Sequence, residues 1–269
     1  MGRRSIQHIV TAKCVIAALF FVTPAATQFS RDQAVCSGQI PAAQPDQRVA
    51  ACTAVIEAGG QTQANLAVIY CARGVAYQAR DHLDRAIADY NESVRIAPTS
   101  ATSFQCRGFG NLARGAINDA IADFNQAIAL DPTSASAFLS RGRAFRAKGA
   151  LNEAIADYDE AIRLDPKNAT IFNNRGVAMI YMKNYGRAID DLDNAIRLNP
   201  SYSEAFVNRG GAYAHQREYE RAIADYTEAI RLDPRNAAAY AGRGGAYSAK
   251  GESAPAKADF DRAKILTGR

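Results

Sequence analysis

The sequence predicts an all-α solenoid of repeated antiparallel helix pairs. Proline recurs at an interval of 34 residues, at positions 98, 132, 166, 200 and 234, and the preceding letters hardly change (AIALDP, AIRLDP, AIRLNP). A fixed period of this length indicates a repeat array, in which each unit stacks on its neighbours. The 269 residues are 48% apolar and 22% charged, which is typical of a folded chain and excludes a disordered one.

Placing each of these prolines at position 32 divides the chain into five full repeats and a slightly shorter sixth. Position 4 is then always aromatic, position 8 always Gly and position 20 always Ala. Gly costs about 1 kcal/mol in a helix interior, so a constant Gly indicates that two helices approach closely there. The repeats span residues 67–100, 101–134, 135–168, 169–202, 203–236 and 237–269.

Two helices are expected in each repeat. Positions 4, 8 and 11 share one face of the first helix, and positions 20, 24 and 27 alternate small and large residues on one face of the second. The proline at position 32 ends the second helix, because the residue before proline is pushed out of the α region. Positions 21 and 28 are Ile or Val except in the sixth repeat, where Lys257 and Lys264 predict a polar cap.

Residues 1–25 are expected to be a secretory signal peptide. Basic residues within 1–13 precede nine apolar residues, 14–22, and small residues favour cleavage after Ala25, with a site at Thr27 as the alternative. An uncleaved anchor is the other interpretation, but nine helical residues cover about 14 Å of a hydrocarbon core that is roughly 30 Å thick. We therefore expect no stable membrane anchor after cleavage.

Residues 26–66 form a leader before the array. Within it, 45–58 has apolar residues at helical spacing before Gly59 and Gly60, and is expected to form the second helix of a degenerate half repeat. Cys36 and Cys52 lie in this leader, and an oxidising compartment would permit a disulfide that closes about 17 residues.

Two further cysteines belong to the array. Cys71 and Cys106 fall at positions 5 and 6 of adjacent repeats, on neighbouring first helices whose axes should lie about 8 to 10 Å apart. We expect their Cα atoms to be too far apart for a disulfide and their thiols to be buried.

The constant columns match the tetratricopeptide-repeat (TPR) signature, and the chain resembles a TPR protein over residues 67–269, more specifically the bacterial exported ones. This resemblance implies a right-handed superhelix. The second repeat departs most from the signature, with Gly110 and Asn111 where Ala and Tyr are preferred, so we expect it to be the most loosely packed. The signature residues of the fifth repeat are Phe206, Gly210, Tyr213, Tyr219, Ala222, Tyr226, Ala229 and Pro234.

The resemblance also implies a concave surface that binds extended peptides, formed mainly by positions 2, 5, 6, 9, 12 and 13 of the first helices. Asn174 and Asn208 match two asparagines of the family's carboxylate clamp, but position 2 supplies none of the clamp's basic residues. A general peptide or protein groove is therefore favoured over a site for a free C-terminus, and simple helix-surface polarity is the alternative for the asparagines. The expected groove residues are Arg143, Arg146, Asn173, Asn174, Tyr181, Asn208 and His215.

Arg occupies position 7 and Asp position 23 in all six repeats. The strict pairing of the two columns favours an ion pair between helices, within or between repeats, over a basic ladder that binds an acidic polymer. The columns are Arg73, Arg107, Arg141, Arg175, Arg209 and Arg243, and Asp89, Asp123, Asp157, Asp191, Asp225 and Asp259.

Enzymatic constellations are absent from the sequence. There is no HExxH, CxxC or GxSxG, and the letters GxGxxA at 108–113 fall within an expected helix that no strand precedes. We therefore expect no enzymatic activity, no cofactor and no metal. Three of the five net positive charges lie in the first 25 residues, leaving +2, which gives little support to nucleic-acid binding.

The sequence thus predicts a non-enzymatic scaffold, periplasmic or secreted, that binds a protein or peptide partner in its concave groove. The alternative is an accessory subunit of a cell-envelope complex, such as a polysaccharide or envelope-enzyme assembly.

Overall fold

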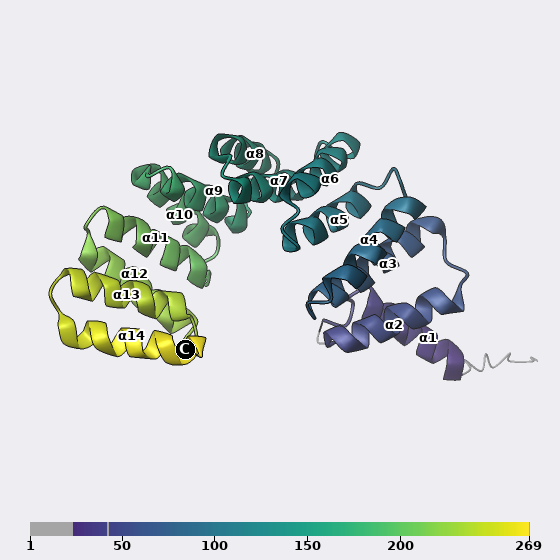
Figure 1. Ribbon diagram of the computed structural model, residues 1–269, viewed down its shortest axis with the longest axis horizontal. Helices are drawn as coiled ribbons and strands as arrows, with labels where there is room; N and C mark the ends of the chain where they lie inside the picture. The colour runs from purple at the N-terminus through teal and green to yellow at the C-terminus, as the bar shows by residue number, and fades with distance from the viewer. Residues whose placement is uncertain (1–23, 42, 269) are drawn as a thin grey trace, which may run out of the picture.

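The computed structural model describes residues 24–41 and 43–268, which contain fourteen α-helices and no strand. Consecutive helices pack as pairs, and each pair packs against the next. The pairs follow one another along an arch, with α1 and α14 at its two ends (Figure 1). The predicted all-α solenoid of helix pairs is confirmed.

Every repeat contributes one pair, and the leader contributes another. The leader pair is α1 (Pro24–Cys36) and α2 (Pro45–Ala58). The first helices of the six repeats are α3 (Gln63–Gln78), α5 (Ala101–Ala113), α7 (Ala135–Lys148), α9 (Ala169–Tyr181), α11 (Ser203–His215) and α13 (Ala237–Ala249). The second helices are α4 (Leu83–Ile96), α6 (Ile117–Leu130), α8 (Leu151–Leu164), α10 (Tyr185–Leu198), α12 (Tyr219–Leu232) and α14 (Ser253–Thr267).

The leader differs from the expected half repeat because α1 precedes α2 and packs against it, which completes a helix pair. α3 also begins four residues before the repeat frame, at a cap where the Thr62 hydroxyl accepts a hydrogen bond from the Asn65 amide at 3.2 Å. Most of the expected signal peptide, residues 1–23, lies outside the described residues.

One large side chain held between small residues forms the core of a repeat. The side chain at position 24 is buried in the first five repeats, and a Cβ atom on Gly142 would lie 2.6 Å from the Tyr158 ring. The position-20 alanines are buried in all six repeats, with exposed fractions of 0 to 4%. The constant Gly and Ala columns therefore mark the closest approach of the two helices.

The last helix is capped as predicted. Lys257 and Lys264 are exposed on α14, and Lys257 Nζ lies 2.7 Å from an Asp261 carboxylate oxygen. Phe260, the position-24 residue of the sixth repeat, is 44% exposed, and no described helix after α14 covers it. None of the helices in the described ranges is both long and apolar enough to cross a bilayer.

The turn inside each repeat holds position 15 in the left-handed region. Gly occupies it in three repeats, with φ of 79°, 83° and 81°, whereas the others carry Asp81, Lys183 and Arg217, with φ of 60°, 59° and 63°. A residue with a Cβ atom costs about 1 to 2 kcal/mol in this conformation, and Gly avoids that cost.

We expect Lys183→Gly to stabilise the protein by about 0.5 kcal/mol, because relief of the left-handed strain exceeds the added freedom of Gly in the unfolded chain. The reciprocal change, Gly149→Lys, should destabilise it by about 1 kcal/mol. Urea midpoints followed by circular dichroism compare the two variants. Shifts in the same direction for both would contradict this account of the turn.

Candidate functional site

The Arg and Asp columns form ion pairs within each repeat, as the sequence favoured. We call this series of six pairs the ladder. The arginine of the first helix meets the aspartate of the second at N–O distances of 2.6 to 2.8 Å in all six repeats. The aspartate side chains are only 6 to 9% exposed. Each guanidinium also lies 5.3 to 5.8 Å from the position-4 ring of its own helix.

The same arginines link neighbouring repeats. The Nη1 atom of each donates a hydrogen bond of 2.6 to 3.4 Å to a side chain on the preceding pair. The six acceptors are Thr53, Asn91, Asn125, Asp159, Asp193 and Thr227. The guanidinium groups are therefore engaged by the fold itself, which argues against a basic ladder that binds an acidic polymer.

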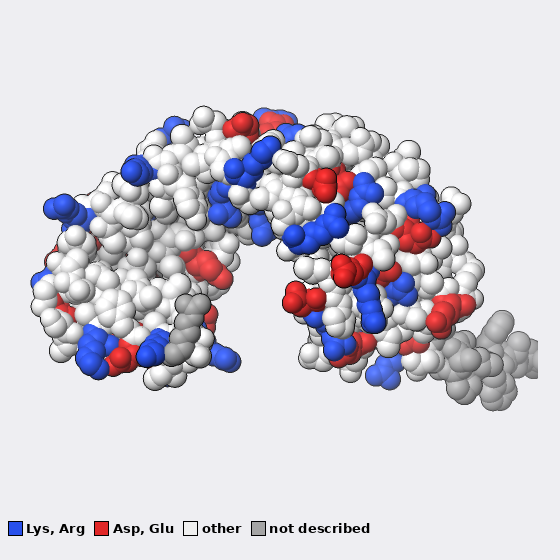
Figure 2. All heavy atoms as spheres, viewed as in Figure 1, with Lys and Arg blue, Asp and Glu red and all other residues white. Residues whose placement is uncertain are grey.

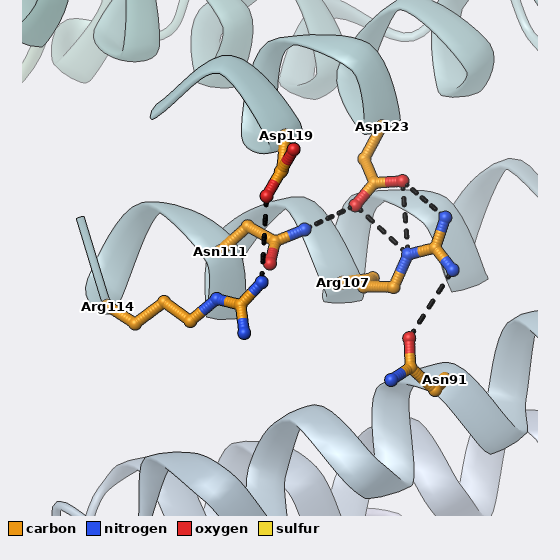
Figure 3. Close-up of polar contacts among 6 residues, drawn as sticks. All are labelled: Asn91, Arg107, Asn111, Arg114, Asp119 and Asp123. Atoms are coloured by element: carbon orange, nitrogen blue, oxygen red, sulfur yellow. Dashed lines mark hydrogen bonds and ion pairs between the residues drawn. The ribbon is translucent and has the colours of Figure 1, made fainter. Parts of the chain in front are cut away.

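The second repeat adds an amide to this network (Figure 3). Arg107 donates to both carboxylate oxygens of Asp123 and reaches Asn91 on the preceding repeat, while the Asn111 amide donates to Asp123 Oδ2 at 2.8 Å. Asn111 is 5% exposed, and a Cβ atom on Gly110 would lie 2.6 Å from the Tyr90 ring of the first repeat. The expectation of loose packing here is wrong, because both departures from the signature make close contacts.

Burial and pairing act in opposite directions on the pKa of Asp225, the position-23 aspartate of the fifth repeat. In the fifth repeat, burial raises the pKa of Asp225 above its ordinary value although Arg209 lowers it. The hydrogen bond from Arg209 to Asp225 in turn raises the pKa of the guanidinium. Arg209 is therefore what allows a charged carboxylate to remain in this interface.

A polar pocket of about 470 Å³ lies across four consecutive repeats. All its residues come from first helices or from the residues that cap them, which places this surface on the first-helix side of the array. Figure 2 shows Lys and Arg side chains along the inner edge of the arch, near α7 in Figure 1. The pocket is lined by Arg143, Arg146, Thr170, Asn173, Asn174, Tyr202, Glu204, Val207, Asn208, Asn236 and Ala238.

Five of the seven residues expected in the groove line this pocket: Arg143, Arg146, Asn173, Asn174 and Asn208. The other two do not. Tyr181 is 64% exposed outside the lining, and His215 stacks on Tyr185 with ring centroids 4.9 Å apart. Both occupy position 13, at the C-terminal end of the first helix, where the chain turns towards the second helix rather than across the groove.

The asparagines are held by local hydrogen bonds. Asn208 Nδ2 donates to Asn173 Oδ1 at 2.9 Å, and Asn174 Nδ2 donates to the Thr170 carbonyl at 2.8 Å. Asn208 thus pairs with Asn173 of the neighbouring repeat and not with Asn174. Among the described residues, the Oδ1 atoms of Asn174 and Asn208 accept no hydrogen bond.

The two arginines of the pocket have no ion-pair partner in the described part of the chain, in contrast to the ladder arginines. Arg143 is exposed, and Arg146 is half-buried with an Nε atom that is buried without a hydrogen-bond partner. Burial raises the pKa of the neighbouring Tyr158 hydroxyl, and Arg146 opposes this rise. Glu204 is the one acidic residue in the lining, so the pocket carries a net positive charge.

Six lining residues that the sequence did not single out lie at three register positions, one of which is position 5, occupied by Val207. Glu204 and Ala238, like Thr170, occupy position 2, a groove position of the family at which the sequence offers no basic residue. Tyr202 and Asn236 occupy position 34, directly before α11 and α13. Position 34 lies two residues before position 2 of the following helix, and this proximity is the signal that could have located Tyr202 and Asn236.

Two disulfides lie in the N-terminal half. Cys36 and Cys52 are joined with Cα atoms 4.8 Å apart, and Cys71 and Cys106 are joined with Cα atoms 6.0 Å apart. The expectation that the second pair lies too far apart is wrong. Helix axes 8 to 10 Å apart bring facing Cα atoms much closer, since each Cα lies about 2.3 Å from its own axis.

No group of three or more His, Cys, Asp or Glu side chains is placed to hold a metal within residues 24–41 and 43–268.

Family models of the tetratricopeptide repeat match most of the array. They cover residues 67–100, 112–145, 142–183, 174–237 and 216–267. The chain belongs to the tetratricopeptide-repeat family. Within this TPR protein, the matched segments account for all six helix pairs from α3 to α14, apart from most of α5.

Solved TPR structures share the fold. MamA is 28% identical, with 60% of this chain and 94% of that chain covered and a TM-score of 0.53. YrrB, described as a TPR protein with an unusual peptide-binding site, is 21% identical, with 66% and 92% covered and a TM-score of 0.51. A TPR protein from Parabacteroides merdae is 16% identical, with 89% and 93% covered and a TM-score of 0.69. No curated protein sequence matches this chain.

Proposed function

We propose that this TPR protein is an exported, non-enzymatic scaffold that holds an extended segment of a partner protein in the polar pocket of the third to sixth repeats. The observation that carries the proposal is that four consecutive repeats together line one pocket in which, among the described residues, the Oδ1 atoms of Asn174 and Asn208 accept no hydrogen bond and the two arginines have no ion-pair partner. The fold does not use these groups for its own stability, unlike the ladder arginines. Such groups are available to a ligand.

The chemistry of the pocket suits a peptide backbone. A peptide that enters a groove loses water from its amides, and each amide then needs a new hydrogen-bond partner. Asn side chains both donate and accept, so Asn174 and Asn208, on adjacent first helices, can bond N–H and C=O groups along an extended chain. YrrB, a TPR protein with an unusual peptide-binding site, supports the same use of this fold.

Export is supported by two features. The basic and apolar composition of residues 1–25 is that of a signal peptide, and two disulfides are typical of an oxidising compartment such as the periplasm. We expect the protein isolated from the periplasm or medium to begin at Ala26, with all four remaining cysteines oxidised. N-terminal sequencing and thiol labelling without reductant measure this, and four free thiols in the isolated protein would argue against export.

Replacing Asn174 and Asn208 together with Ala is expected to weaken partner binding by about 10-fold while leaving helicity and melting nearly unchanged. Both side chains are partly exposed, and the one contact between repeats that is lost is the hydrogen bond from Asn208 to Asn173. Each lost hydrogen bond to a peptide backbone contributes about 0.5 to 1.5 kcal/mol. The measurement is the affinity of the captured partner for each variant. Glu228→Ala and Glu160→Ala, on the second helices, are the matched control.

Photo-crosslinking tests the site directly. A photoreactive amino acid at position 174 should crosslink the partner, and the same amino acid at position 228 on α12 should not. Crosslinks confined to position 228, together with full binding by the double Asn variant, would move the site to the second helices and defeat the proposal.

A further inference from the structure

The inner surface changes character along the array. In the first two repeats, position 9 carries Val75 and Phe109, which are 47% and 36% exposed, and position 2 of the first repeat carries Val68, which is 54% exposed. In the third repeat, position 9 is Arg143. An apolar segment of the groove therefore adjoins the arginine-bearing pocket.

Repeat symmetry places the apolar residues on the same surface as the pocket. Thr170, Glu204 and Ala238, which share position 2 with Val68, all line the pocket, and so does Arg143, which shares position 9 with Val75 and Phe109. Val68 also lines a second hollow of about 410 Å³, between α1, α2 and α3. Exposed Val and Phe side chains in such a row gain most from contact with an apolar ligand group.

We infer, resting on the proposed function, that the groove selects a bipartite peptide: a carboxylate bound by Arg143 and Arg146, and an apolar side chain bound on α3 and α5. The carboxylate is the group that matches two guanidinium forks without ion-pair partners. Arg143 is exposed and Arg146 half-buried in the pocket lining, and no carboxylate within the described residues holds either guanidinium, which leaves both able to meet a ligand carboxylate.

The spacing follows from helix packing. α3 packs against α5, and α5 against α7, at axis separations of about 8 to 10 Å each. The apolar residues thus lie about one to two helix spacings from the arginines, or about 8 to 20 Å. At about 3.3 Å per extended residue, the apolar side chain and the carboxylate should be about three to six residues apart.

The test is selection of a phage-displayed library of random 12-residue peptides on the full exported, oxidised protein. We expect enriched peptides to carry Asp or Glu about three to six residues from Leu, Ile, Val or Phe. Arg143→Gln with Arg146→Gln should weaken the binding of a selected peptide by about 10- to 100-fold. Val68→Ser with Val75→Ser should weaken it by about 10-fold.

Controls keep the two sides of the inference separate. Arg197→Gln on α10 removes the same charge outside the groove, and Ile265→Ser removes an exposed apolar side chain on α14; both should bind as the parent does. Circular dichroism melts of every variant show that the array is intact. Each selected peptide is also synthesised in two forms. One keeps the acidic side chain and ends in a C-terminal amide, and the other lacks the acidic side chain and has a free C-terminus. Their affinities distinguish a side-chain carboxylate from the C-terminal carboxylate.

The outcomes separate this inference from the proposed function. Selected peptides that lose affinity in the Asn174 and Asn208 double variant but carry no common acidic residue would overturn the inference and leave the groove in place. Selected peptides that bind all groove variants equally, or a library that yields no binders, would overturn the proposed function and the inference together.

Discussion

Replacing Arg209 with Met is expected to destabilise the array by about 3 kcal/mol, because it leaves the buried Asp225 carboxylate without its partner. The side chain of Asp225 is 9% exposed, and Arg209 meets it with two hydrogen bonds of 2.9 and 2.7 Å. Removing one member of a buried pair typically costs about 3 to 5 kcal/mol, and the partial exposure of Arg209 places this site at the lower end. Urea unfolding followed by circular dichroism measures the loss.

The pH dependence of the same variant gives a second readout. Burial already raises the pKa of Asp225, and loss of Arg209 should raise it further above its unfolded value. The native state then binds a proton more tightly than the unfolded state does, so stability must rise as the pH falls towards the unfolded pKa of about 4. We expect the deficit relative to the parent to shrink between pH 7 and pH 5.

Arg231→Met is the matched control, since it breaks the exposed pair with Glu228 on α12, the second helix of the same repeat. Exposed pairs of this kind contribute little, so the control should unfold close to the parent at every pH. A deficit for Arg209→Met that is no larger than that of Arg231→Met would show that the ladder does not hold the repeats together.

The repeat frame was predictable because each column has a single packing role. All five first helices after α3 begin at position 1, and the second helices of the first five repeats occupy the segment that the proline at position 32 ends. The Arg and Asp columns were predictable for the same reason. Chains that stack identical units must repeat their contacts, so a constant column reports a contact that recurs.

The features that the sequence did not predict depend on three-dimensional geometry that the constant repeat positions do not specify. α1 lacks the aromatic and Gly columns, so nothing in its sequence marked it as part of a helix pair. The bond between Cys71 and Cys106 depended on where two side chains lie around their helices, and the axis separation alone suggested too large a gap. The departure of Tyr181 and His215 from the pocket likewise follows from their place at the ends of α9 and α11.

About half of the residues that line the pocket could be predicted from the sequence. The family's groove positions located Arg143, Arg146 and the asparagines, because these positions are properties of the fold. The pairing of Asn208 with Asn173 was not predictable, since the sequence does not show whether the Asn208 amide meets the position-5 or the position-6 asparagine of the preceding repeat. Which polar groups stay free for a ligand therefore emerges only when all the neighbours of each side chain are known.

Ala188→Leu is expected to destabilise the protein by about 1 to 3 kcal/mol, because it forces three more carbon atoms between α9 and α10. Ala188 is completely buried, and its carbonyl oxygen lies 3.2 Å from where a Cβ atom on Gly176 would stand. The interface also holds the buried Leu192, so there is no space into which the larger side chain can rotate.

Gly186→Leu is the control for Ala188→Leu, because it adds a larger side chain to the same helix two residues earlier. A Cβ atom at Gly186 meets nothing within 4 Å, and Leu has a higher helix propensity than Gly, so this variant should be as stable as the parent or slightly more stable. The urea midpoint should therefore fall for Ala188→Leu and hold or rise for Gly186→Leu. Equal midpoints for Ala188→Leu and the parent would show that the position-20 face is not the point of closest helix contact.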